Sequence, residues 1–270
     1  MADINDEVLA EAYNRALSLE KQGKLEEAAQ AYAQVLELDP EDHGGAAIRL
    51  ASMGLGSTPA KAPDAYVSTL FDQHAEVFDS ILVEQLGYAV PMMVRDKLSK
   101  HYQKPFKKLL DLGCGTGLSA EALDGMAAHK TGVDISEGMV EVAYDKEVYE
   151  DLYVSEAVAF LQQKEETRWD LIVATDVIPY MGDLAEFFTG VSDNLEKDGV
   201  FAFSSETLSS GTSETEAFKV GDFQRFAHSE DYIKRELKQN SFELLEMEPI
   251  IVRYEQGNPV PGHLVLCVNS

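Results

Sequence analysis

Short apolar runs alternate with helical segments over the second half of the chain. Five runs have the length and composition of buried strands: 107–110, 129–134, 151–155, 169–176 and 200–206. Good helix formers at helical spacing occupy 118–123, 137 onward, 183–195 and 229–239. Two final strands, 242–254 and 263–268, are separated by the turn Gln256-Gly257-Asn258-Pro259, which predicts antiparallel pairing. The pattern predicts an α/β fold with a seven-stranded sheet ending in an antiparallel hairpin.

Residues 1–56 have a different, all-helical pattern. Helices are expected at 11–21 and 25–38, and Asp39-Pro40 ends the second one. Small, aromatic and proline residues fall where a tetratricopeptide repeat (TPR) places them, namely Gly23, Ala28, Tyr32 and Pro40. The segment therefore resembles one such repeat, with half of another after it, although Arg15 and Ala16 depart from the repeat pattern.

Such a short repeat segment is not expected to be stable alone, because about three repeats are needed to bury a common core. It must dock on the main domain, pair with another copy or hold a partner. A structural cap and a module that recruits a protein both remain open. Residues 57–65, with a serine and two prolines directly after Gly56, are expected to be a linker, and 66–270 the main domain.

Composition narrows the class of protein. A formal net charge of −26 repels phosphate backbones, which argues against a nucleic-acid substrate. Solubility, or adaptation to salt, explains this charge more simply than the steering of a cationic substrate. The chain contains no apolar run long enough to cross a bilayer, begins unlike a secretory signal and has only two cysteines. We expect a soluble cytoplasmic protein with no membrane partner.

The run Leu109-Leu110-Asp111-Leu112-Gly113-Cys114-Gly115-Thr116-Gly117 carries the strongest motif in the chain. It places a glycine-rich turn between a predicted strand and a predicted helix, as in loops that hold nucleotides. The glycine spacing differs from the dinucleotide fingerprint, and the phosphate-binding motif G-x-x-x-x-G-K-[ST] is absent. Asp111, directly before the loop, suits a ligand with a cationic end. The motif resembles the first motif of class I S-adenosylmethionine (SAM)-dependent methyltransferases.

This resemblance implies a Rossmann-like methyltransferase sheet with SAM as cofactor. Together with the TPR-like segment before it, the chain resembles the predicted methyltransferases that carry an N-terminal tetratricopeptide repeat. Asp134 lies 21 positions beyond Gly113, near the spacing at which a carboxylate binds ribose hydroxyls. Ser136 is expected to cap the next helix. Other cofactor contacts implied by the resemblance are Asp111, Gly113, Cys114, Gly115, Gly117, Ile135, Met139, Glu156, Ala157 and Asp176.

The segment 66–79 contains the pattern F-D-x-x-A-x-x-F-D. It resembles the N-terminal lid helix of small-molecule methyltransferases, in which an aromatic side chain closes over SAM. Phe71 and Phe78 are seven residues apart, so they would share one face of a helix, although core packing explains that spacing equally well. His74, between them, either contacts the cofactor or serves only a local structural role.

The sequence says less about the methyl acceptor than about the cofactor. Asp176-Val177-Ile178-Pro179-Tyr180 lacks the paired prolines of enzymes that methylate amide or exocyclic amino nitrogens. The polar stretch 207–228 is predicted to be a mobile substrate lid, since long loops in compact α/β domains often cover sites. His228 is the candidate general base, or else caps the following helix, and Tyr180 is the second catalytic candidate.

Three functions fit the sequence. The leading hypothesis is a methyltransferase that acts on a small molecule, with Arg225 and Arg253 available to bind a substrate carboxylate. The second is a methyltransferase whose TPR-like segment recruits a protein substrate. The third is a non-catalytic SAM-binding interaction protein. The six histidines are scattered and H-E-x-x-H is absent, so no metal site is expected.

Overall fold

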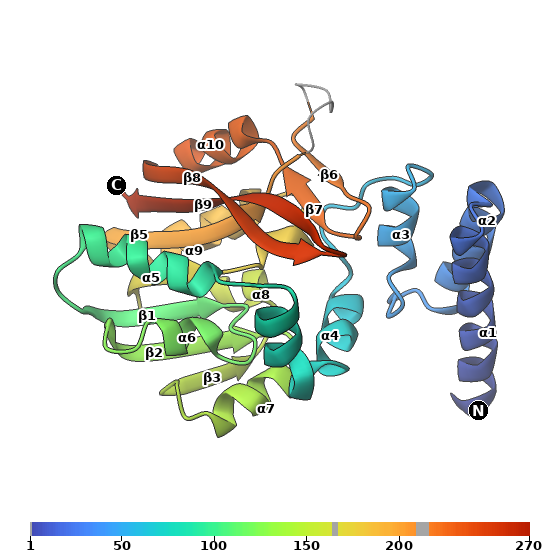
Figure 1. Ribbon diagram of the computed structural model, residues 1–270, viewed down its shortest axis with the longest axis horizontal. Coiled ribbons are helices and arrows are strands. Elements are labelled where there is room, and N and C mark those ends of the chain that lie inside the picture. The colour runs from blue at the N-terminus through green and yellow to red at the C-terminus, as the bar shows by residue number, and fades with distance from the viewer. Residues whose placement is uncertain (1, 164–166, 209–215) are drawn as a thin grey trace.

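The computed structural model describes residues 2–163, 167–208 and 216–270. Its helices and strands fall into two parts, a group of N-terminal helices and a larger part built on a sheet (Figure 1). Among the described residues, no helix combines the length and the apolar composition that crossing a membrane requires.

The N-terminal part consists of α1 (Ala2–Lys21), α2 (Leu25–Leu38) and α3 (Ala46–Ser52). The first two helices lie side by side, and α3 lies between them and the sheet (Figure 1). The ring of Tyr13 meets the ring of Tyr32 edge-on at 6.1 Å, and Arg49 donates to the Tyr13 hydroxyl at 3.1 Å. The predicted pair of repeat helices is therefore present, and the second helix has the predicted bounds.

Seven strands form the main sheet in the order β3-β2-β1-β4-β5-β9-β8. Neighbours among the first five strands pair in parallel, whereas β9 pairs antiparallel with both β5 and β8. The strands are β1 (Phe106–Leu112), β2 (Ala127–Asp134), β3 (Asp151–Val154), β4 (Trp169–Ala174), β5 (Leu195–Glu206), β8 (Phe242–Glu255) and β9 (Asn258–Asn269). The predicted sheet and its C-terminal hairpin are confirmed.

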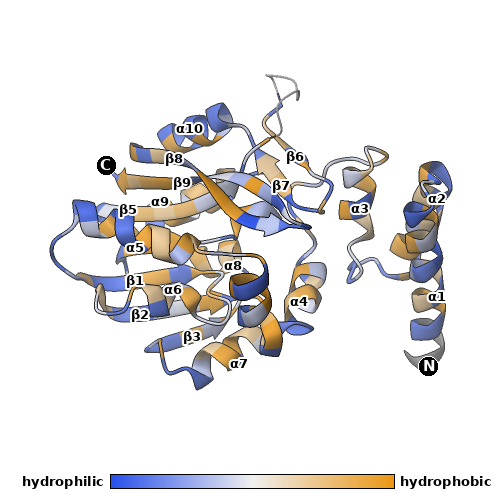
Figure 2. Ribbon diagram, viewed as in Figure 1, coloured by the Kyte–Doolittle hydropathy of each residue, from blue (hydrophilic) through white to orange (hydrophobic). Residues whose placement is uncertain are grey.

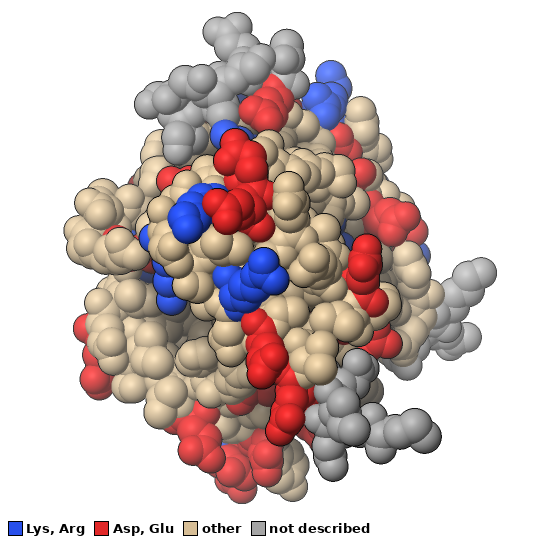
Figure 3. Space-filling model, turned by 90° about the vertical axis from the view of Figure 1, so that its right-hand side faces the viewer, with Lys and Arg blue, Asp and Glu red and all other residues tan. Residues whose placement is uncertain are grey.

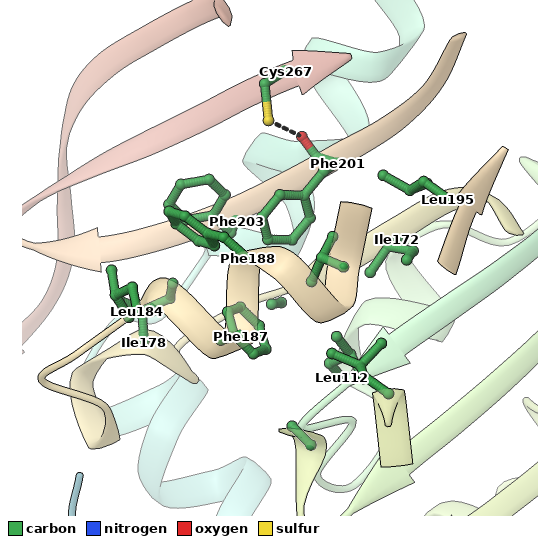
Figure 4. Packing of buried hydrophobic residues seen from close by; sticks show 14 of the residues in the cluster. Leu112, Ile172, Ile178, Leu184, Phe187, Phe188, Leu195, Phe201, Phe203 and Cys267 are labelled. Atoms are coloured by element: carbon green, nitrogen blue, oxygen red, sulfur yellow. Dashed lines mark hydrogen bonds between the residues drawn. The ribbon is translucent and has the colours of Figure 1, made fainter. Parts of the chain in front are cut away.

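Helices cover both faces of the sheet, as its nearly continuous apolar strands require. The helices of this part are α5 (Val90–His101), α6 (Leu118–Ala122), α7 (Glu137–Asp145), α8 (Ala157–Leu161), α9 (Ala185–Asn194) and α10 (Glu230–Gln239). Side chains of α8, α9 and α10 pack on one face, where Phe188, Phe201 and Phe203 form an aromatic group (Figure 4). Side chains of α5 pack on the other face, and β5 and β9, which pair with each other, are largely apolar (Figure 2).

The predicted lid helix is shorter than expected. Residues 66–79 form not one helix but α4 (Asp64–Asp72) and the 3-10 turn η1 (Ala75–Val77), followed by the π-helical turn η2 (Ser80–Gln85). The α-helix ends where Asp72 bonds to groups outside it, and the His74 ring lies 2.8 Å from the Leu70 carbonyl oxygen. We call α4, η1 and η2 together the cap.

The stretch 207–228, predicted to be a mobile substrate lid, contains regular structure that the sequence did not indicate. It contains β6 (Phe218–Val220) and β7 (Phe226–His228), which pair antiparallel as a separate two-stranded sheet. The hairpin forms because Phe226 and Val220 are buried against other residues. Residues 209–215 of the predicted lid lie outside the described residues.

The helical segment docks on the main part through the hairpin and the linker. Ile48 of α3 is fully buried and packs in one cluster with Tyr180, Val220 and Phe226. In the linker, Ala62 N–H donates to the Tyr180 carbonyl oxygen at 2.9 Å. Of the arrangements left open by the sequence, docking on the main domain is the one observed. The face on this side carries mostly acidic charges with a few basic ones between them (Figure 3).

Candidate cofactor and substrate site

The glycine-rich loop joins β1 to α6 at the carboxyl end of the sheet. Gly113, Gly115 and Gly117 have φ angles of 66°, 52° and 94°, a region that favours glycine. A Cβ on Gly115 would lie 4.0 Å from the Phe78 ring, so the loop leaves a bare backbone below the cap. This backbone is therefore suited to close approach by a ligand.

Asp134, the last residue of β2, connects this loop to the start of α7. Its Oδ2 accepts from Gly115 N–H at 2.8 Å, and its Oδ1 accepts from Ser136 N–H at 2.9 Å. Each oxygen retains lone-pair capacity for a hydroxyl donor. Burial raises the pKa of Asp134 from 3.8 to about 6. Ser136 caps α7 as predicted, because its Oγ accepts from Met139 N–H at 3.1 Å.

A cavity lies beyond these strand ends, as expected for a ligand site in an open α/β sheet. It encloses about 1030 Å³ of empty space, including its open mouth. The structure brings together eleven of the predicted site residues in its lining: Phe71, Phe78, Gly113, Cys114, Gly115, Asp134, Ile135, Glu156, Ala157, Asp176 and Tyr180. The lining also includes three linker-region residues that the sequence did not indicate: Lys61, Ala62 and Asp64.

Four predicted cofactor contacts do not line the cavity. Asp111 is fully buried behind the loop, where Tyr149 O–H donates to its Oδ2 at 2.5 Å, and burial raises its pKa to about 7. Met139 is buried in α7. Gly117 packs against Val148, and a Cβ on Gly117 would lie 2.8 Å from the Val148 side chain. His74 faces its own helix, as described above. Their positions support the loop or the cap rather than direct contact with a ligand.

His228 also lies outside the cavity lining. It is fully buried between the rings of Phe218 and Tyr232, and its Nε2 lies 3.1 Å from the Gly182 carbonyl oxygen. Burial lowers its pKa from 6.5 to about 4, and its Nδ1 finds no partner within the described residues. Within the described residues His228 is not part of the cavity lining, so its role as general base stays a prediction. The helix cap is Ser229 instead, whose Oγ accepts from Tyr232 N–H at 3.3 Å.

Two aspartates of the cap, which the sequence did not indicate, accept hydrogen bonds from the glycine loop and from α7. Asp72 accepts hydrogen bonds from Ser136 Oγ at 2.5 Å and Gly138 N–H at 3.0 Å. Asp79 accepts from the Thr116 hydroxyl and from Lys146 Nζ, the latter at 2.7 Å. Each follows a phenylalanine of the cavity wall. The repeated Phe-Asp pair in the sequence is therefore the signal for these two contacts.

Buried charged side chains gather near the cavity at the end of β4. Asp176, just after β4, has a φ of 60° and meets Arg253 at 3.2 Å and Arg225 at 3.4 Å. Arg253 also pairs with Glu206 at 2.6 Å. Arg225 lies over the Tyr180 ring, with its Cζ 5.4 Å from the ring centroid. The cavity is thus lined by the glycine loop and by the charged side chains of Asp176 and Arg225, whereas their partners Glu206 and Arg253 lie outside its lining.

Comparison with known proteins identifies the family. Residues 85–247 match the family model described as "Methyltransferase domain", and residues 11–42 match "Tetratricopeptide repeat". The chain belongs to the methyltransferase domain family. SAM is the cofactor that this membership and the structural neighbours imply.

Among curated relatives, a ubiquinone biosynthesis O-methyltransferase of Pelagibacter ubique is 29% identical over 43% of this chain and 50% of its own length. A malonyl-[acyl-carrier protein] O-methyltransferase of Bacillus anthracis is 31% identical over 36% of each chain. The chain thus spans half or less of the length of these relatives.

Solved structures share the fold. An S-adenosylmethionine-dependent methyltransferase from Clostridium acetobutylicum aligns with a TM-score of 0.54, covering 74% of this chain and 98% of that chain at 19% identity. Magnesium protoporphyrin IX methyltransferase from Synechocystis PCC 6803, solved with bound SAM, aligns with a TM-score of 0.50 over 85% and 97% at 16% identity.

The residues of this site fit SAM. The bare Gly115 backbone provides space beside the loop, and Asp134 presents a carboxylate that two hydroxyls can share. Apolar and aromatic walls, including Phe71 and Phe78, suit the remainder of the molecule. Within the described residues, no group of histidine, cysteine or acidic side chains has the arrangement of a metal site.

Proposed function

We propose that this protein transfers a methyl group from SAM to a small molecule bound in the same cavity. The observation that carries the proposal is that one cavity is lined both by the glycine loop with Asp134 and by the charged residues Asp176 and Arg225. A cofactor and a small acceptor can occupy it together. The curated relatives above are named as O-methyltransferases, one of ubiquinone biosynthesis and one of malonyl-[acyl-carrier protein], which supports methyl transfer to oxygen.

The protein's part in this reaction is mainly to position the reactants. SAM supplies a methyl group already activated by its sulfonium, so the chain must align the acceptor and exclude water. Asp134 would hold the ribose, and the backbone of 113–115 would lie along the cofactor. Phe71, Phe78 and Tyr180 close the cavity from the cap side, since the Phe71 ring meets the other two at 5.8 and 5.4 Å.

The second candidate is methylation of a protein recruited by the helical segment. The match to a tetratricopeptide repeat favours it. However, α3 is used for docking, and Lys61 and Ala62 of the linker line the cavity. The linker therefore contributes to the site wall and α3 fixes the helical segment to the main part, contacts that recruitment alone would not require.

The proposal is tested with purified full-length protein, SAM and a library of small acids, phenols and amines, with release of S-adenosylhomocysteine as the readout. Turnover of a small molecule is expected to depend on Asp134. A parallel incubation with a cell extract, followed by separation of methylated proteins from methylated small molecules, distinguishes the two candidates. Methyl label found only in protein would favour the second.

A further inference from the structure

Arg225 and Arg253 both reach Asp176, but their surroundings differ. Arg253 is fully buried and pairs with Asp176, Glu206 and Glu255, the last at 2.8 Å. Arg225 lines the cavity, with a fifth (20%) of its side chain exposed. Within the described residues it donates one hydrogen bond, to Asp176 at 3.4 Å, and a guanidinium has five N–H donors. Most of its donors are therefore available to a ligand.

The β6–β7 hairpin fixes Arg225 at this place. Gly221 N–H donates to the Arg225 carbonyl oxygen at 2.8 Å and closes the turn before β7. The neighbouring Phe226 and Val220 are packed against Ile48 of the helical segment. Tyr180 lies below the guanidinium. Arg225 is thus held by an element outside the seven-stranded sheet and is largely preorganised for binding.

We propose that Arg225 binds a carboxylate of the acceptor, so that the substrate is an organic acid with an apolar body. This inference rests on the proposed function. The planar fork of a guanidinium matches a carboxylate with two parallel hydrogen bonds. The apolar body would lie against Phe71, Leu82 and Met181, which line the same cavity. Arg253 takes no part in this contact, because its charge is already used by three carboxylates.

The charged side chains around Arg225 limit how much negative charge a ligand bound there can carry. Asp176 and Glu206 lie within 3.4 and 3.8 Å of its Nη1, and Arg253 and Glu255 complete the group. Three carboxylates thus accompany two guanidiniums, which gives the group a formal charge of −1, so a monoanion is repelled less than a phosphate dianion. The positive sulfonium of SAM in the same cavity would offset the added charge. Acid binding is therefore expected to be stronger when the cofactor position carries a positive charge.

Calorimetry on the full chain tests this directly. The protein is loaded with S-adenosylhomocysteine, which is neutral at sulfur, or with sinefungin, which carries an ammonium group in place of the sulfonium. Benzoate, cinnamate and octanoate are then titrated in parallel with their primary amides. At least one acid is expected to bind about tenfold or more tightly than its amide, and more tightly with sinefungin.

Three variants complete the test. Arg225→Gln should lower the affinity for the acid to that of the amide, and Arg225→Lys, which keeps the charge but not the fork, should restore part of it. Arg235→Gln is the matched control, because Arg235 lies on α10 with more than half of its side chain (55%) exposed. Binding of S-adenosylhomocysteine to each variant confirms that the cofactor side is intact.

The inference is overturned if every acid binds no better than its amide, or if Arg225→Gln keeps the preference for the acid. The same holds if none of the three acids binds to protein loaded with sinefungin. Failure of S-adenosylhomocysteine itself to bind the wild-type chain is a different result. It would contradict the proposed function and remove the basis of this inference with it.

Discussion

Asp72 of the cap lies 2.5 Å, oxygen to oxygen, from the hydroxyl of Ser136, the residue that caps α7. The same carboxylate oxygen accepts from Gly138 N–H at 3.0 Å. Ser136 N–H in turn donates to Asp134 at 2.9 Å. The cap is therefore joined by hydrogen bonds to the carboxylate expected to bind ribose. Cofactor binding and closure of the cap should be coupled through these contacts.

Replacing Asp72 by Ala should weaken S-adenosylhomocysteine binding by about tenfold, because hydrogen bonds to a carboxylate are lost and the cap opens more easily. Calorimetry gives the affinity, and hydrogen exchange over 64–85 should become faster. Asp96→Ala is the control, since Asp96 is exposed on α5 and pairs with Arg95. Equal affinity in wild type and Asp72→Ala would show that the cap is not coupled to the cofactor.

His228 should make the fold sensitive to acid. Because burial lowers its pKa to about 4, the unfolded chain binds a proton between pH 6.5 and 4 that the folded chain does not. The stability contributed by neutral His228 is present above pH 6.5 and is lost as pH falls toward 4, by about 3 kcal/mol. The raised pKa values of Asp111 and Asp134 act in the opposite direction.

The comparison with His228→Gln isolates this effect, since both proteins keep the two aspartates. Denaturant unfolding at pH 7 and pH 4.5 gives the free energy of unfolding of both proteins. On acidification, wild type should lose more of this free energy than His228→Gln. A difference that stays constant with pH would contradict the burial of a neutral imidazole. The same variant should keep its affinity for S-adenosylhomocysteine, because His228 does not line the cavity.

Ile48→Ala should destabilise the whole protein rather than the helical segment alone. Ile48 is fully buried between α3 and the β6–β7 hairpin, and truncation of such a side chain costs about 2–5 kcal/mol. Thermal unfolding should remain one transition at a lower temperature. Val8→Ala on α1 is the control, because Val8 is 46% exposed. Two separate transitions, with the larger one unchanged, would show that the helices fold independently of the site.

The sequence predicted the sheet and the glycine loop well, because both depend on local patterns. Apolar runs mark buried parallel strands, and glycines at 113, 115 and 117 mark a backbone with positive φ. Asp134 follows from its position at the end of the second strand. These features require no knowledge of distant contacts.

The sequence is less informative where distant residues decide the structure. The break in the lid helix depends on bonds from Asp72 to Ser136 and Gly138, more than sixty positions away. His228 lies in a polar stretch, yet Phe218 and Tyr232 enclose it, and this burial was not visible in the local pattern. The arrangement of Arg225 and Arg253 likewise depends on how β7 and β8 meet Asp176.

The central claim, that Asp134 and the glycine loop bind SAM, is tested most directly by titrating S-adenosylhomocysteine into wild type and Asp134→Ala. The wild-type chain should bind, and the variant should bind about a hundredfold more weakly, because charged hydrogen bonds to the ribose are lost. Circular dichroism should show that the variant is folded at the temperature of the titration. Unchanged affinity in a folded Asp134→Ala protein would contradict the account.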